Sequence, residues 1–146
     1  MRDLPRQLTV DQLAELFEGR TRLVELLAEH EDPLGPAAEE LAAGLTEEKK
    51  LDALNVHPAI GARALSPRSA AEQGADADPA TLTELAYLNQ VYEEKFGFRF
   101  VVFVDRRPKS EIVPVLRDRL ERTRDEELET AIRELVAIAR DRWARG

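Results

Sequence analysis

A chain of 146 residues with a formal net charge of −8 and no cysteine lacks the basic face of nonspecific nucleic-acid binders and cannot form disulfides, thiol nucleophiles or cysteine metal sites. Its length favours one domain over residues 1–146, large enough to bury about two-thirds of its unfolded surface. No apolar stretch resembles a secretion signal or could cross a bilayer, so we expect a cytoplasmic protein without a membrane partner.

Apolar periodicity and capping residues predict consecutive helices along the chain. Thr9 begins the first helix, and Gln12 three residues later completes a capping box. We expect a similar box, formed by Thr81 and Glu84, to begin the strongest helix, with Gly97 just past its C-terminal end. In chain order, the expected helices lie near residues 9–17, 23–27, 36–43, 46–55, 81–95, 110–122 and 125–145.

The run Phe98-Arg-Phe-Val-Val-Phe-Val104 departs from the helical pattern. Its β-branched and aromatic residues are typical of a strand, yet the chain offers no second strand to pair with it. Its backbone groups must therefore bond to helix ends, water or a ligand. Either the run is a connector that fills the core, or its backbone donors line a pocket. The expected fold is an all-α, single-domain helical bundle with one extended apolar segment near residues 98–104.

His57 is the more central of two histidines, and it precedes Pro58 at a predicted helix end. A residue before proline is pushed out of the helical conformation, so the imidazole stands at the break. There it could serve as an acid or base near neutral pH. A histidine that merely interacts with the helix dipole would explain the same position. His30, among glutamates before a loop, is expected on the surface.

Ser69-x-x-Glu72 also has two interpretations. The spacing is that of a capping box, which is a structural feature. A helix N-terminus nevertheless directs free N–H groups and positive potential at whatever lies beyond it, so a cap does not exclude a binding site.

The last predicted helix carries an arginine on its apolar side. At the helical repeat, Arg142 lies roughly 40° from Leu128 on that side, whereas Arg133 and Arg140 fall outside it. A buried arginine requires an anionic or strongly polar partner, and both Glu72 and a ligand are candidates. A long stem that carries the charge out to water is the competing explanation. Arg140 is expected to be solvated. The apolar side comprises Leu128, Ile132, Leu135, Val136, Ala139 and Trp143.

Common cofactor motifs are missing from the sequence. There is no dinucleotide fingerprint, no phosphate-binding loop and no nucleophile elbow. With two histidines and no cysteine, we expect no metal site. Any catalysis should be acid–base chemistry that uses no cofactor.

Several short motifs follow one another along the chain: His57-Pro58, Ser69-x-x-Glu72-Gln73, Leu88-Asn89-x-x-Tyr92, Phe96-Gly-Phe-x-Phe100, Glu111-Ile112, Arg119-Leu120 and Ile138-Ala139-x-x-Arg142. This ordered series resembles a known family, the decarboxylases of 2-oxo-4-hydroxy-4-carboxy-5-ureidoimidazoline (OHCU), which act last on the route from urate to (S)-allantoin. The similarity covers about residues 50 to 143. It implies an all-α protein without a cofactor that acts on a small anionic substrate and could be a homodimer.

The resemblance also implies a role for each matching residue. His57 would be the main acid–base residue, Glu72 would lie beside it, and Arg142 would be the cationic contact to the ligand. The remaining pocket positions would be Pro58, Ser69, Gln73 and the backbone of Phe100, Val101, Val102, Phe103 and Val104.

This sequence departs from the family's pattern at three places. The interval from His57 to Ser69 is short, Asp105-Arg106-Arg107 replaces a turn that usually contains glycine, and Arg122 stands where asparagine is usual. Two other functions remain open at this point. One is a helical interaction module without an active site, and the other is a relative that acts on a different ureido or purine-derived compound.

Overall fold

The computed structural model describes residues 3–60 and 78–146, and within these ranges every regular element is a helix. The predicted all-α class is confirmed. None of the helices in these ranges is long and apolar enough to cross a membrane. The helices are α1 (Val10–Leu16), α2 (Arg22–Ala28), α3 (Ala38–Ala43), α4 (Glu47–Asn55), α6 (Pro79–Phe96), α7 (Lys109–Leu120) and α8 (Arg124–Arg145).

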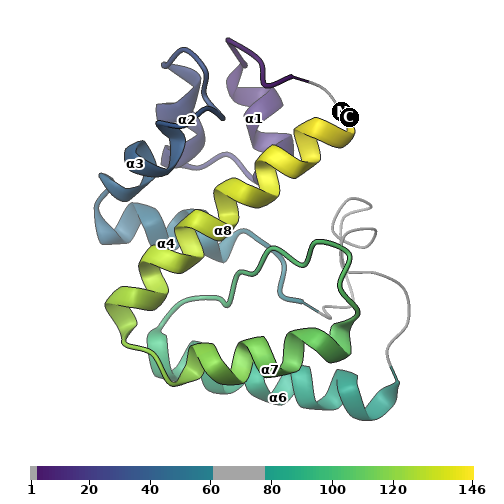
Figure 1. Cartoon of the computed structure of the whole chain (residues 1–146). Coiled ribbons are helices and arrows are strands. Elements are labelled where there is room, and N and C mark those ends of the chain that lie inside the picture. Colours follow the sequence, from purple (N-terminus) through teal and green to yellow (C-terminus); the bar gives the residue numbers. More distant parts are fainter. Residues whose placement is uncertain (1–2, 61–77) are drawn as a thin grey trace.

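The long C-terminal helix α8 packs against helices from the first part of the chain (Figure 1). It packs against α1, α3 and α4, while α6 and α7 lie side by side as a pair. At the end of α8, the indole Nε1 of Trp143 donates a hydrogen bond of 2.8 Å to the carbonyl of Asp3. The apolar side expected for this helix is buried at Leu128, Ile132, Leu135, Val136 and Ala139, and Trp143 is partly buried.

Several local predictions are confirmed by the backbone. The Thr9 hydroxyl caps α1 and Gln12 completes the box. Gly97 ends α6 with φ = 80°, a conformation that glycine adopts without the steric cost of a side chain.

The expected start of α6 is wrong. The helix begins at Pro79, and the Asp78 carboxylate accepts the Thr81 N–H at 2.7 Å. Proline suits the first helical position because its missing N–H would have no partner there, so Asp-Pro takes the role expected of Thr81. Glu84 pairs with Arg117 on α7 instead of capping. Leu82, in the first turn of α6, is 39% exposed.

The segment that follows α6 is extended but pairs with no strand in the described part of the chain. Side chains supply partners to its backbone: Asn55 accepts the Arg99 N–H at 3.1 Å, and Glu134 on α8 accepts the Phe103 N–H at 3.3 Å. Its side chains at Phe98, Phe100, Val101, Val102 and Val104 are buried. The prediction that this run fills the core is therefore confirmed for its side chains.

The turn after this segment explains one departure from the family's pattern. Asp105 and Arg106 both adopt left-handed backbone angles, with φ of 49° and 61°, where glycine is favoured. Arg107 holds the turn closed, because its backbone N–H donates to the Val104 carbonyl at 3.0 Å and its guanidinium donates to the Phe103 carbonyl at 2.7 Å. Hydrogen bonds from Arg107 thus stabilise a turn that glycine would adopt at lower steric cost.

Candidate active site

His57 lies in the break after α4, as the sequence predicts. Its backbone N–H donates to the Leu54 carbonyl at 3.1 Å, in a turn that follows the end of α4 at Asn55. The side chain is 7% exposed, and its Nδ1 has no hydrogen-bond partner among the described residues. A buried polar atom without a partner is costly in a folded protein and marks a place where a ligand could bond.

The environment of His57 keeps its imidazole neutral. Burial is the largest effect, and together with the nearby Arg142 cation it lowers the pKa of His57 to about 4. Arg99 lowers the pKa further, whereas the Glu18 carboxylate raises it. At neutral pH the ring is therefore uncharged, and one of its nitrogens can accept a hydrogen bond. Arg142 and Glu18 both act electrostatically on this ring, so the fold brings positions 18, 57 and 142 together.

Arg142 is 1% exposed, so the explanation in which its stem carries the charge to water is wrong. Its Nη1 donates to the Leu16 carbonyl at 2.8 Å, and its Nη2 lies 3.2 Å from a carboxylate oxygen of Glu18. Both partners belong to the end of α1. The helical repeat correctly placed this arginine inside, and Glu18, one anionic partner, comes from the first part of the chain. Glu72, the partner suggested by the sequence, lies outside the described residues.

Glu18 is the functional candidate that the sequence did not reveal. It follows α1 with φ = 64°, and the Gly19 N–H bonds back to the Ala14 carbonyl at 3.0 Å. This is the bond pattern of a helix end that normally places glycine in the left-handed position. The available signal was a buried arginine in search of an acid, but nothing local distinguishes Glu18 from the other glutamates.

Two side chains fix the backbone on either side of His57. Arg99 donates through Nη1 to the His57 carbonyl at 2.7 Å and to the Asn55 carbonyl at 3.2 Å. Asn89 on α6 donates to the Ile60 carbonyl at 3.3 Å. The break after α4 is thereby tied to the extended segment and to α6, which positions the imidazole.

A buried ionic network supports the extended segment from the other side. The Glu127 carboxylate, 0% exposed, accepts bonds from Arg119 at 2.7 Å, Tyr92 at 2.6 Å and Arg122 at 3.2 Å. Arg119 also donates to the Val101 carbonyl at 2.7 Å. Burial raises the pKa of the Tyr92 hydroxyl, so it donates as a neutral group. Arg122, which stands where the family usually has asparagine, thus gains a partner here.

The remaining expected pocket residues divide into two groups. Pro58 is half-buried and follows His57 in the chain. The run from Phe100 to Val104 is held by the hydrogen bond from Arg119 to the Val101 carbonyl. Ser69, Glu72 and Gln73 lie outside the described residues.

Comparison with known proteins identifies the family. The OHCU decarboxylase family matches this chain over residues 2–144. The chain belongs to the OHCU decarboxylase family. A 2-oxo-4-hydroxy-4-carboxy-5-ureidoimidazoline decarboxylase of Halalkalicoccus jeotgali is 30% identical over 113 residues, which are 74% of this chain and 64% of that protein. A protein of the same description from Haloferax volcanii is 33% identical over 119 residues, 77% of this chain and 70% of that protein.

A solved structure shares the fold of this OHCU decarboxylase family member. The crystal structure of OHCU decarboxylase in the presence of (S)-allantoin aligns with a TM-score of 0.70 and 24% identity, over 92% of this chain and 96% of that chain. The similarity extends to the first helices, where the sequence motifs gave no match. The chain thus spans almost the whole of that structure, but 64% of the Halalkalicoccus relative.

The prediction that Arg140 is solvated in this family member is wrong. Its Nε and Nη2 each donate at 2.7 Å, to the carbonyls of Leu34 and Gly35, and its Nη1 donates to Glu39 at 3.0 Å. The helical repeat correctly put Arg140 outside the apolar side of α8. It could not show that the loop before α3 covers that part of the helix.

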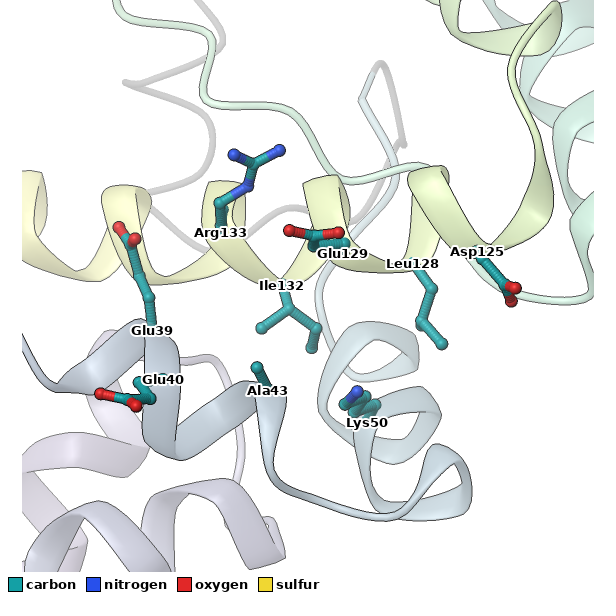
Figure 2. A pocket seen from close by; sticks show the side chains of 9 residues that line it. All are labelled: Glu39, Glu40, Ala43, Lys50, Asp125, Leu128, Glu129, Ile132 and Arg133. Atoms are coloured by element: carbon teal, nitrogen blue, oxygen red, sulfur yellow. The ribbon is translucent and has the colours of Figure 1, made fainter.

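A groove of about 480 Å³ lies elsewhere on this OHCU decarboxylase family member, between α3, α4 and α8 (Figure 2). Charged side chains surround an apolar floor, and neither His57 nor Arg142 belongs to it. The lining residues are Glu39, Glu40, Ala43, Lys50, Asp125, Leu128, Glu129, Ile132 and Arg133.

Proposed function

We propose that this chain is a cofactor-independent carboxy-lyase that converts OHCU to (S)-allantoin at the end of urate degradation, with residues 1–146 acting as one domain. One observation carries the proposal: a buried, neutral His57 lies within the electrostatic reach of a fully buried Arg142 in a member of the OHCU decarboxylase family. An uncharged imidazole whose Nδ1 has no hydrogen-bond partner among the described residues, together with a fixed cation, suits a decarboxylation.

The reaction needs a place for an electron pair. The substrate carries a hydroxyl and a carboxylate on one ring carbon. When the carbon–carbon bond to the carboxylate breaks, CO2 leaves and the electron pair of that bond spreads into the adjacent C=N bond and the carbonyl oxygen attached to the ring (the ring oxygen). Protonation of one face then gives a single enantiomer of allantoin. The enzyme must therefore stabilise charge on the ring oxygen and deliver a proton from one side.

His57 and Arg142 divide these tasks. The neutral imidazole accepts a hydrogen bond from the substrate hydroxyl, or its proton. It later helps to deliver the proton that reaches the carbon. Arg142 is best used near the ring oxygen, where negative charge develops. A cation that gripped the departing carboxylate would stabilise the substrate more than the transition state and slow the reaction.

The other predicted residues complete the pocket in this proposal. Glu72 orients the hydroxyl or carboxylate beside His57, and Ser69 and Gln73 bind the substrate. Pro58 and the backbone of Phe100, Val101, Val102, Phe103 and Val104 shape the wall.

Circular dichroism tests the proposal directly. Urate, urate oxidase and hydroxyisourate hydrolase generate OHCU in the cuvette, and this protein is then added. We expect one allantoin enantiomer to appear much faster than in the uncatalysed mixture. The matched variant is His57→Asn, which keeps the backbone bond to Leu54 and loses the base. A wild-type rate equal to the background contradicts the function, whereas normal turnover by His57→Asn contradicts the role of the imidazole.

A further inference from the structure

We propose that Glu18 is a positioning residue of this site, which fixes the Arg142 guanidinium in one orientation and offsets its charge. The inference rests on the proposed decarboxylase function and adds a residue from outside the matching motifs. In this proposal, the end of α1 makes Arg142 stabilise the charge that develops during the reaction more than the charge of the substrate carboxylate.

The end of α1 holds Arg142 at two points. The Leu16 carbonyl accepts at 2.8 Å, and the Glu18 carboxylate lies at 3.2 Å. Leu16 is the last residue of α1, so its carbonyl has no partner within the helix and the negative end of the helix dipole favours a cation. Because a guanidinium is a rigid planar fork, two contacts of this kind define the direction of the whole group.

Glu18 occupies a backbone conformation that is unfavourable for it. Its φ of 64° lies in the left-handed region, at the helix-end position where glycine is preferred. A non-glycine residue persists there when its surroundings impose the conformation, and such residues cluster at functional sites. Here the left-handed turn places a carboxylate against a buried arginine, which a glycine could not do.

The charge of Glu18 matters because the substrate is an anion. A buried guanidinium without a counter-charge would attract the substrate carboxylate and stabilise the ground state. Paired with Glu18, Arg142 attracts a formal anion less and remains a donor for a ring oxygen that becomes negative later. The charged groups that act on His57 from the packed elements are Arg142 on α8, Arg99 on the extended segment and Glu18 after α1, and Glu18 opposes the other two.

Two substitutions of Glu18 separate orientation from charge. Glu18→Gln keeps an oxygen acceptor and removes the charge, whereas Glu18→Gly removes both and relieves the backbone. Glu15→Gln is the matched control, because Glu15 is an exposed residue of the same helix. In the coupled assay, we expect kcat to fall about tenfold in Glu18→Gly and less in Glu18→Gln. KM should fall roughly fivefold in both, because Arg142 then attracts the substrate carboxylate more strongly.

A second measurement does not depend on turnover. The chain has two histidines, and His30 is exposed, so an NMR titration gives two imidazole signals with His30 as the internal reference. Removal of the Glu18 charge should move the midpoint of His57 to lower pH, and Glu15→Gln should leave it unchanged. This result tests the contact even if the wild type does not decarboxylate OHCU.

The outcomes distinguish the two proposals. If kcat and KM of the two Glu18 variants match those of Glu15→Gln, the positioning role is overturned. A higher melting temperature of Glu18→Gly with normal kinetics, which is the behaviour of a plain helix end, also overturns it. An unchanged His57 midpoint in Glu18→Gln overturns the contact itself. A shifted midpoint in an inactive wild type contradicts the decarboxylase function and leaves the link between Glu18, Arg142 and His57 in place.

Discussion

At the scale of single residues, His57 makes the stability of the fold depend on pH. Its pKa is about 4 in the folded chain, against an ordinary value of 6.5. Between these values the unfolded chain binds the extra proton, so stability must rise with pH. The contribution is fully present above about 6.5 and is lost as the pH falls through about 4.

We therefore expect the free energy of unfolding to increase by up to about 3 kcal/mol across this interval because of His57. The measurement is urea denaturation of the wild type and of His57→Asn at a series of pH values. The difference between the two proteins isolates the histidine from the carboxylates that titrate nearby. Parallel curves for both proteins would show that His57 titrates normally.

Neighbouring arginines of α8 should respond to substitution in opposite ways. Arg142→Lys keeps a charge but loses the planar fork that Leu16 and Glu18 hold, so most activity should be lost. Arg140→Ala removes three bonds to the loop before α3 and should cost about 2 kcal/mol of stability with normal kinetics. Steady-state kinetics with melting temperatures separate the two. Equal activity in both variants would remove Arg142 from the site.

At the scale of helices and turns, two glycines at helix ends offer a direct contrast. Gly97 has φ = 80°, and an added Cβ would meet no atom within 4 Å, so the cost of a side chain there is purely conformational. Gly44 has φ = −78°, with ordinary contacts at 3.5 and 3.7 Å.

We expect Gly97→Ala to destabilise the fold by about 1 kcal/mol. Gly44→Ala should be neutral or stabilise it by up to about 1 kcal/mol, since alanine restricts the unfolded chain. Thermal unfolding of both variants checks the signs. A stabilised Gly97→Ala would mean that the end of α6 is not left-handed in solution.

Elements whose signals are local could be predicted from the sequence. The capping box at Thr9 and the C-terminal glycine of α6 depend on residues within one turn, and the apolar side of α8 depends on its own periodicity. The predicted start of α6 was wrong because two possible caps lie within three residues of each other, and Asp78-Pro79 is the better one. The extended segment after α6 was recognised by composition, although its partners were not.

Contacts between distant segments could not be predicted in this way. The repeat of α8 showed that Arg142 is buried, but the identity of Glu18 as its partner depends on how α1 packs. The same reason explains the error at Arg140, whose loop partners lie more than a hundred positions away in sequence. Within the candidate site, local pattern and resemblance predicted His57 and Arg142, whereas Glu18 could be proposed only from the fold.

At the scale of the whole molecule, the buried carboxylate of Glu127 connects three helices. It accepts bonds from Tyr92 on α6 and from Arg119 on α7 while lying on α8 itself. Arg119 continues the connection to the extended segment through the Val101 carbonyl. The α6–α7 pair is thereby fastened to the rest of the chain by a polar group inside the core.

Glu127→Ala should therefore destabilise the fold by about 3–5 kcal/mol, because it leaves buried cations without their anion. Its neighbour Glu126 serves as the control: it is exposed and completes the cap of α8, so Glu126→Ala should cost about 1 kcal/mol or less. Chemical denaturation measures both. Similar losses in the two variants would mean that the network contributes no more than an ordinary cap.

The bond between Trp143 and Asp3 gives the chain a built-in optical reporter. Trp143 is the single tryptophan, so the emission spectrum arises from one place. That place is adjacent in sequence to Arg142 and in contact with the beginning of the chain. Detachment of the N-terminal segment from α8 would expose the indole to water and shift its emission to longer wavelength. Fluorescence can thus follow, in real time and without a label, whether the segment before α1 stays in contact with α8 next to Arg142.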